Sequence, residues 1–150
     1  MATLSAAEAC AMLALRQAVF IIEQRCIYAD IDAADRTAYH LLGWQKSQAG
    51  PEISTRVLAA YLRVLPPGTK SPECVIGRVV TAPHVRGTGL GRLLMHEGLQ
   101  QASRLYPGLP IKISAQVHLQ RFYKNFGFVA VSVPYDEDGI AHIDMLRRGF

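Results

Sequence analysis

The sequence predicts an α+β domain with a mostly antiparallel sheet, and three features indicate that class. An amphipathic helix is expected near the N-terminus, apolar β-prone runs follow it, and a glycine-rich loop then joins a further strand to a second helix. The chain has 150 residues, of which 50% are apolar, and this size suits one compact domain with a sizeable core. We therefore expect a single domain over residues 1–150.

The first helix is predicted from a capping signal and an apolar stripe. Ser5–Glu8 has the capping-box form, in which the serine and glutamate side chains satisfy backbone donors at a helix start. The helix should begin at about Ala6, with Arg16 interrupting its apolar inward face. Only Met1–Leu4 precedes it, so a strand there is absent or very short. The aspartates of Glu23–Asp35 show no periodicity, and we interpret this segment as a solvated acidic loop.

Strands are predicted from apolar runs that turn residues separate. Tyr39–Gln45 and Arg56–Leu65 lie on either side of Gly50 and Pro51, and they should pair antiparallel. Cys74–Thr81 is almost entirely apolar or β-branched, which is expected of a central strand covered on both faces.

The C-terminal half is predicted to alternate strands and helices. Its expected elements are a helix at Gly89–Tyr106, a strand at Pro110–Ala115, a short helix at Val117–Phe126, and a hairpin of Phe128–Pro134 with Ala141–Arg147 around the turn Asp136–Gly139.

Composition excludes several classes of protein. Cys10, Cys26 and Cys74 are too few and too scattered for a disulfide framework or a zinc site, and we expect no metal. The net charge is +4, but the basic residues form no block, which favours a small polyanionic partner over nucleic acid. No segment approaches the ~18 apolar residues of a membrane helix. We expect a soluble, cytoplasmic protein with no membrane partner.

The segment Arg86–Gly91 has the character of a phosphate-binding loop. It lies between a predicted buried strand and a helix, where free backbone N–H groups and the helix dipole attract phosphate oxygens. Gly87 and Gly89 can adopt positive φ and turn consecutive amides toward one anion, while Arg86 and Arg92 add positive charge. The glycine spacing fits neither the Rossmann fingerprint nor the Walker P-loop.

The spacing does match the R-x-x-G-x-G pattern of the GNAT N-acetyltransferase superfamily, which this chain resembles. A second signature of that family, F-Y-x-x-x-G-F, is matched at Phe122–Phe128. The segments Val19–Asp35 and Glu137–Met145, together with His40, resemble the ElaA-type branch. The resemblance implies an αβα sandwich whose mostly antiparallel sheet is splayed where acetyl-CoA binds.

The resemblance also implies residue roles on the coenzyme side. It assigns the pyrophosphate to Arg86, Gly87, Thr88, Gly89, Leu90, Gly91 and Arg92, the pantetheine arm and acyl carbonyl to Val79, Val80 and Thr81, and a pantetheine hydrogen bond to Gln116. Gln116 stands where the family usually has asparagine. Tyr123 takes the position of the general acid that protonates the departing thiolate; the alternative is an aromatic ring that only packs at a helix end.

The acceptor side is less defined by sequence. Glu23 is our first choice of general base, because it ends an apolar helix where burial would raise its pKa, whereas the aspartates of the loop look too exposed. Alternatively, Glu23 pairs with Arg63 or Arg78, two cations in an apolar sheet that need a carboxylate from the protein or the substrate. His142 could line the same cleft, as could His40, although a lone strand histidine is more often structural.

These observations predict an enzyme that moves an acetyl group from acetyl-CoA to a primary amine of a small molecule or peptide, directly and in a ternary complex. The alternative from another class is a non-enzymatic acyl-CoA-binding or sensing domain. The oligomeric state stays open, with a homodimer as one option.

Overall fold

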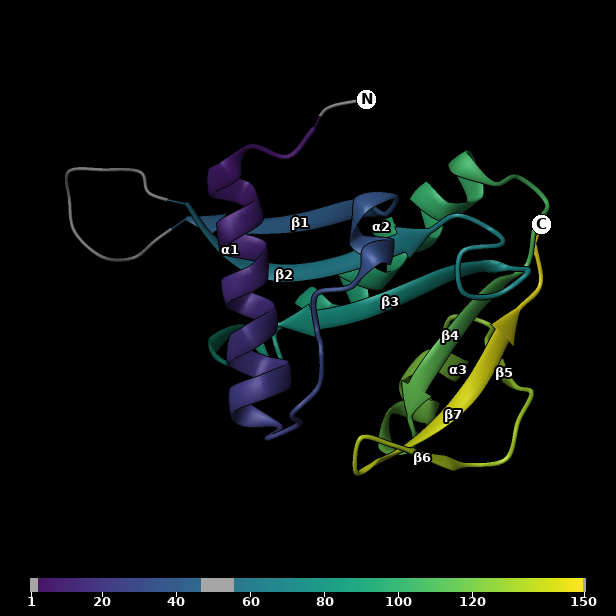
Figure 1. The fold of residues 1–150 in the computed structure, drawn as a ribbon. Coiled ribbons are helices and arrows are strands. Elements are labelled where there is room, and N and C mark those ends of the chain that lie inside the picture. The colour runs from purple at the N-terminus through teal and green to yellow at the C-terminus, as the bar shows by residue number, and fades with distance from the viewer. Residues whose placement is uncertain (1–2, 47–55, 150) are drawn as a thin grey trace.

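A mixed, strongly twisted sheet forms the centre of the fold (Figure 1), in a computed structural model that describes residues 3–46 and 56–149. Its strands are β1 (Tyr39–Lys46), β2 (Arg56–Leu65), β3 (Cys74–Thr81), β4 (Ile111–Gln116), β5 (Val129–Ala130), β6 (Tyr135–Glu137) and β7 (Ile140–Arg147). Within the described residues their order is β1-β2-β3-β4-β7-β5, with β6 also pairing β7. Only β3 and β4 pair in parallel. The predicted α+β class with a mostly antiparallel sheet is confirmed.

The helices are α1 (Ala6–Arg16), η1 (Gln17–Glu23), η2 (Ala33–Arg36), η3 (Pro83–Val85), α2 (Leu90–Leu105), η4 (Val117–Leu119) and α3 (Gln120–Lys124). The capping box is present, because the Glu8 amide donates to Ser5 Oγ at 3.2 Å and the Ser5 amide donates to Glu8 Oε2 at 2.8 Å. After Arg16 the helix widens into the π-helical turn η1, closed by a bond from the Gln24 amide to the Val19 carbonyl. No helix among the described residues is long and apolar enough to cross a membrane.

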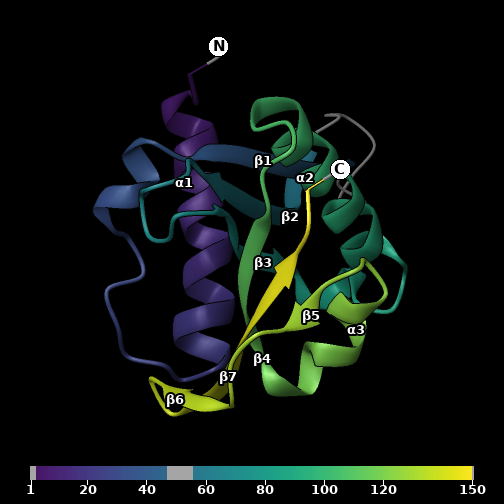
Figure 2. The same cartoon turned by 90° about the vertical axis from the view of Figure 1, so that its right-hand side faces the viewer.

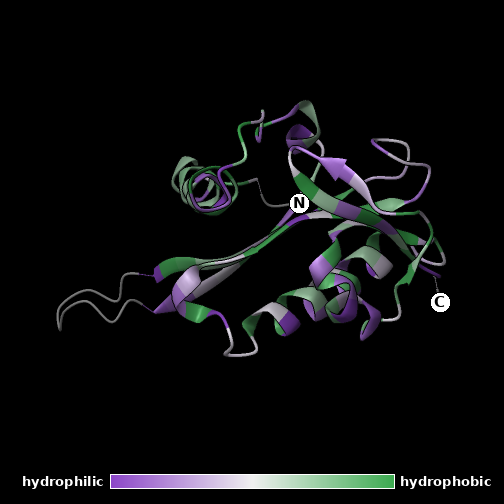
Figure 3. Ribbon diagram, turned by 90° about the horizontal axis from the view of Figure 1, so that it is seen from below, coloured by the Kyte–Doolittle hydropathy of each residue, from purple (hydrophilic) through white to green (hydrophobic). Residues whose placement is uncertain are grey.

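Helices cover both faces of the sheet and create two apolar cores (Figure 3). On one face, Met12 and Leu15 of α1 pack against Ala59 and Tyr61 of β2. On the other face, α2 packs against alternate residues of the same strand, such as Leu62, while α3 packs against β4. β2 is therefore buried on both sides and supports the rest of the fold.

Close packing of α2 depends on Gly98. A Cβ atom at this position would lie 2.6 Å from Leu62 Cδ2, so a larger residue would force the buried Leu62 side chain to shift. The contact fixes α2, and with it the loop from which α2 begins, relative to β3.

The sheet opens between β3 and β4, as Figure 1 shows. These strands pair only at Cys74 with Ile111 and at Val75 with Lys112. β3 continues along β2 as far as Thr81, while β4 follows β7 as far as Gln116. The expected splayed sheet is therefore present.

Three local expectations need correction. Cys74–Thr81 is covered only partly on one face, because it lies beside this gap. The C-terminal hairpin is tighter than predicted: Asp136 and Glu137 belong to β6, and only Asp138 and Gly139 make the turn. The strand predicted at Phe128–Pro134 is reduced to β5.

Two further expectations concern the segment before α1 and the connection between β1 and β2. Residues 3–5 form no strand before α1, as anticipated. Gly50 and Pro51, expected to separate β1 from β2, lie outside the described residues.

Candidate active site

The loop before α2 presents unsatisfied backbone donors to solvent. Gly87 and Gly89 have φ of 79° and 92°, and Gly89 caps α2 without any side-chain hydrogen bond. Among the described residues, the amides of Gly89, Leu90 and Gly91 donate to no acceptor. Consecutive free amides at a helix start form an anion site. The loop therefore fits a pyrophosphate.

A groove of about 720 Å³ leads from this loop along β3. Its lining contains ten of the twelve residues assigned to the coenzyme: Val79, Val80, Thr81, Arg86, Gly87, Thr88, Gly89, Gly91, Arg92 and Tyr123. It also contains Val85, Leu119 and Phe122, which the sequence analysis missed. Leu119 and Phe122 could have been found, since both belong to the segment that carries the second motif.

The two remaining coenzyme candidates lie elsewhere. The Leu90 side chain packs into the apolar cores, so only its backbone amide faces the loop. Gln116 lines the neighbouring cavity and donates to Gln24 Oε1 at 3.3 Å. Its extra methylene carries the amide toward the far side of the gap.

Glu23 is not where the sequence analysis expected it. Its side chain is 41% exposed and pairs with both terminal nitrogens of Arg86, at 2.8 and 3.0 Å. The last turn of η1 rotates Glu23 away from Arg63 and Arg78. The expected burial of Glu23 and its pairing with a strand arginine are both wrong, and it lines neither cavity.

A β-bulge in β3 shapes the gap. Arg63 faces Gly77 and Tyr61 faces Val80, so Arg78 and Val79 together oppose the single residue Leu62. Arg78 has φ of 53°, a conformation that is costly for a non-glycine residue and is often found at functional sites. The bulge directs Arg78 into a second cavity, separate from the groove. Val79 lies at the boundary between the groove and this second cavity.

The second cavity, of about 420 Å³, lies between the splayed strands on the side of α1. Arg63, Arg78 and His142, predicted to bind the acceptor, all line it. The segment after η1 closes it, since Cys26 Sγ contacts the Asp138 carbonyl at 3.6 Å where that segment passes the β6–β7 turn (Figure 2). We refer to it as the acceptor cavity.

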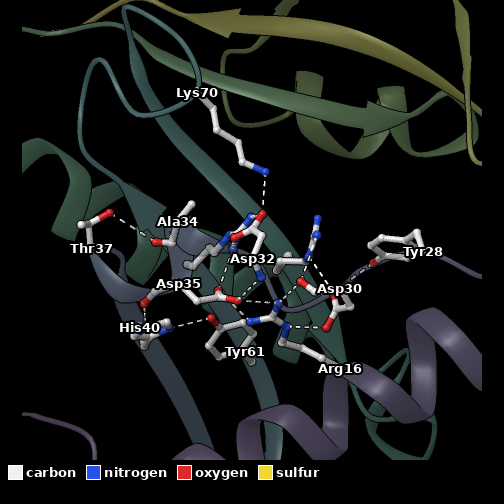
Figure 4. Close-up of polar contacts among 12 residues, drawn as sticks. Arg16, Tyr28, Asp30, Asp32, Ala34, Asp35, Thr37, His40, Tyr61 and Lys70 are labelled. Carbon is white, nitrogen blue, oxygen red and sulfur yellow. Dashed lines mark hydrogen bonds and ion pairs between the residues drawn. The ribbon is translucent and has the colours of Figure 1, made fainter.

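A cluster of buried ion pairs (Figure 4) reaches the acceptor cavity, which Asp32 and Arg63 line. Arg16 is fully buried and bonds Asp30 and Asp35, each at 2.8 Å. Arg63, 2% exposed, bonds Asp32 at 2.7 Å and Asp35 at 2.6 Å. The interpretation of Glu23–Asp35 as a solvated loop is therefore wrong: its aspartates fold inward because buried arginines require carboxylates.

The pKa values in this cluster follow from the pairing. Hydrogen bonds from Arg63 lower the pKa of Asp32 against the opposing effect of burial, and Lys70 adds to the lowering. Burial alone would raise the pKa of Asp35, but its bonds to Arg16 and Arg63 lower it overall. Asp32 and Asp35 therefore stay ionised at neutral pH and cannot serve as acids.

The hydrogen bonds of His40 and His142 show how each imidazole is held. His40 bonds the Asp35 carbonyl at 2.9 Å and the Tyr61 hydroxyl at 2.7 Å, so it supports the ionic cluster and does not line the cavity. His142 Nδ1 lies 2.8 Å from the Ile140 carbonyl and must carry the proton there. In the neutral imidazole, Nε2 is then the lone-pair acceptor.

Tyr123 stands between the two cavities and lines both, together with Val79 and Leu119. Its ring is 7% exposed and packs edge-on against Phe122 and Phe128. Burial raises the pKa of Tyr123 to about 12, so the phenol keeps its proton at neutral pH.

Comparison with known proteins identifies this arrangement. Residues 54–148 match the family described as "Acetyltransferase (GNAT) domain". The chain belongs to the GNAT acetyltransferase family. It is 41% identical to protein ElaA of Escherichia coli K12 over 147 residues, which is 97% of this chain and 90% of ElaA.

Solved GNAT structures share the fold. An acyl-CoA N-acyltransferase from Pseudomonas aeruginosa superposes with a TM-score of 0.86 at 43% identity, covering 96% of this chain and 92% of that one. The crystal structure of E. coli ElaA gives a TM-score of 0.86 at 40% identity, covering 97% and 93%. The GNAT fold, and within it the similarity to ElaA, are therefore established for this chain.

Proposed function

We propose that the protein is an acetyl-CoA-dependent N-acetyltransferase that acetylates a primary amine of a small molecule or peptide by direct transfer in a ternary complex. The observation that carries the proposal is the junction of the two cavities at Val79, Leu119 and Tyr123. A thioester in the groove and an amine in the acceptor cavity can meet only there.

The coenzyme side supplies binding and orientation. The free amides of Gly89, Leu90 and Gly91 would hold the pyrophosphate, with Arg86 and Arg92 adding charge. Beyond Val75, β3 pairs with no described strand on its β4 side. Its residues Val79, Val80 and Thr81 can therefore offer backbone groups to pantetheine, as they would to an added strand. A bulge amide beside the thioester carbonyl can polarise it.

The transfer requires two proton movements. The neutral amine nitrogen forms a bond to the acetyl carbon, the carbon–sulfur bond breaks, and its electron pair leaves with sulfur. Tyr123, protonated at neutral pH, donates its proton to that thiolate or stabilises it by hydrogen bonding. The acceptor nitrogen, originally an ammonium, loses one proton before attack and another after it.

We assign the proton acceptor to His142 and no longer to Glu23. Glu23 is exposed and pairs with Arg86 outside the acceptor cavity. His142 lines that cavity, its side chain is 14% exposed, and its Nδ1 bond leaves Nε2 able to accept a proton. His142→Gln should lower kcat/KM by about 100-fold, the low end for a general base. A kcat/KM within about twofold of the wild type would exclude this role.

The proposal is tested by an acetyl-CoA consumption screen across amino acids, peptides, polyamines and aminoglycosides, with calorimetric binding of acetyl-CoA measured in parallel. Turnover with any amine supports an enzyme. Tight acetyl-CoA binding without turnover on any class would instead support the acyl-CoA-binding or sensing domain.

A further inference from the structure

The ionic cluster at the acceptor cavity is an unbranched chain of alternating charges. Followed contact by contact, it runs Arg78, Asp30, Arg16, Asp35, Arg63, Asp32, Lys70, with nitrogen–oxygen distances from 2.6 to 2.8 Å. Each carboxylate is shared by two cations. Four cations thus face three carboxylates, and the excess positive charge falls at the two ends (Figure 4 labels most of the members).

Both ends of the chain open into the acceptor cavity. Arg78 and Lys70 line it, and their side chains are 22% and 48% exposed, whereas Arg16 and Arg63 inside the chain are buried. Among the residues that the structure describes, each end pairs with a single carboxylate, Arg78 with Asp30 and Lys70 with Asp32.

The end residues keep unused hydrogen-bond donors. Arg78 Nε lies 2.7 Å from Asp30 without the alignment of a hydrogen bond, and Nη2 donates to the Asp30 carbonyl at 3.3 Å. Among the described residues Arg78 Nη1 has no partner, and Lys70 uses one of its three N–H groups. The tyrosine ring of Tyr28 stacks 5.2 Å from the Arg78 guanidinium and restricts its orientation.

We propose that the acceptor is an amino carboxylate whose carboxylate group binds between Arg78 and Lys70 and completes the alternation of charge. This assignment rests on the proposed N-acetyltransferase function. With a fourth carboxylate bound between the two ends, each of the four cations has two anionic partners, and the excess charge is neutralised.

The position of Arg78 limits the spacing between the carboxylate and the amine. Arg78 directly precedes Val79, the residue shared by both cavities where transfer would occur. A carboxylate held by Arg78 therefore lies close to the attacking nitrogen, which favours a free amino acid over a long peptide. The lining of the cavity also contains Glu137, Asp138 and His142, which suit the ammonium group of the same molecule.

The same geometry disfavours polyamines. A second ammonium group would have to enter beside Arg78 and Lys70, and like charges at such distances repel. Aminoglycosides are disfavoured for the same reason.

The test compares amines that differ only in the carboxylate. Acetyl-CoA consumption is measured with L-alanine and ethylamine, L-serine and ethanolamine, and L-tyrosine and tyramine; amides of the amino acids and spermidine complete the panel. We expect kcat/KM at least about tenfold higher for the best amino acid than for its decarboxylated or amide partner, the size of one charge-assisted hydrogen bond.

Variants then locate the effect. Arg78→Gln and Lys70→Gln should each raise KM for the best amino acid about tenfold, leave KM for the matched amine within twofold, and leave acetyl-CoA affinity unchanged. Lys70 is half exposed, so Lys70→Gln keeps the test valid even if Arg78→Gln fails to fold. Arg104→Gln, an exposed cation on α2, is the control and should change neither value.

The outcomes separate this inference from the proposed function. Equal turnover of amines and amino acids, or a preference for spermidine, overturns the inference while leaving an N-acetyltransferase. Absence of turnover on every amine, despite acetyl-CoA binding, overturns both. A carboxylate preference that survives in Lys70→Gln and Arg78→Gln unchanged also overturns the inference, because another group must then hold the anion.

Discussion

The groove proposed for the coenzyme shares Val79, Leu119 and Tyr123 with the acceptor cavity, yet the two sites are built in different ways. The groove is made largely of backbone: glycines at positive φ and the free amides at the start of α2. The acceptor cavity is made of side chains from segments far apart in the chain, held by the ionic cluster. A site made of backbone groups requires glycines at a fixed spacing, and that spacing can be recognised in the sequence. A site made of side chains from distant segments leaves no such local pattern.

The largest expected effect is on the acceptor side, through Arg16→Met. This change leaves Asp30 and Asp35 buried without their central cation, and breaking such a pair costs about 3–5 kcal/mol of unfolding free energy. Urea unfolding followed by circular dichroism measures it. Arg104→Met, at an exposed position of α2, is the control and should stay within about 0.5 kcal/mol of the wild type. A loss below about 1 kcal/mol for Arg16→Met would mean that the cluster is not structural.

On the coenzyme side, Gly89→Val should weaken acetyl-CoA binding by about 100-fold or more. A β-branched residue does not adopt the φ of 92° that directs the free amides toward one point. Gly91→Ala is the matched control: Gly91 has no positive φ, and its added Cβ would meet Thr81 Cγ2 at an ordinary 3.8 Å. Calorimetry measures the acetyl-CoA affinity of both folded variants. Equal affinity in Gly89→Val and wild type would remove the loop from the site.

At the junction of the two regions, Tyr123→Phe should lower kcat by about 100-fold, the low end for a general acid. The ring and its packing against Phe122 and Phe128 are kept, so acetyl-CoA affinity and stability should not change. Because the pKa of Tyr123 is about 12, the loss should be the same from pH 6 to 9. A fall of only about threefold would indicate orientation of the thiolate without proton transfer.

The contrast between the regions also explains what the sequence could predict. The strand–loop–helix order and the R-x-x-G-x-G spacing identified most of the groove, because φ at Gly87 and Gly89 restricts the residue type. The bounds of β2 and β3 matched the expected runs, because burial on a sheet selects apolar, β-branched residues.

The aspartates of the acceptor wall were missed for a physical reason. Local sequence around Asp30, Asp32 and Asp35 is that of an ordinary polar loop, and only long-range packing buries it. A signal was available in the arginines: Arg16 on an apolar helix face and Arg63 in an apolar strand both require buried carboxylates. Glu23 was chosen because it ends an apolar helix, but at the end of the π-helical turn η1 it lies exposed and pairs with Arg86.

The smallest expected effect concerns Glu23, and it separates the two assignments of the general base. Glu23→Gln removes one member of an exposed ion pair with Arg86, an interaction of about 0.2–1 kcal/mol that salt screens. The freed Arg86 can then approach the pyrophosphate, so acetyl-CoA should bind up to about fivefold more tightly at low salt and equally at high salt. Because Glu23 lines neither cavity, kcat should stay within about twofold of the wild type.

His142→Gln, measured beside Glu23→Gln, provides the contrast. A lost general base costs about 100-fold or more, so the two variants should differ by nearly that factor in kcat/KM. The reverse result, with Glu23→Gln inactive and His142→Gln active, would mean that η1 moves Glu23 into the acceptor cavity when coenzyme binds. In that case the pair with Arg86 would be a resting contact that the pyrophosphate displaces, since Arg86 would exchange one anion for another.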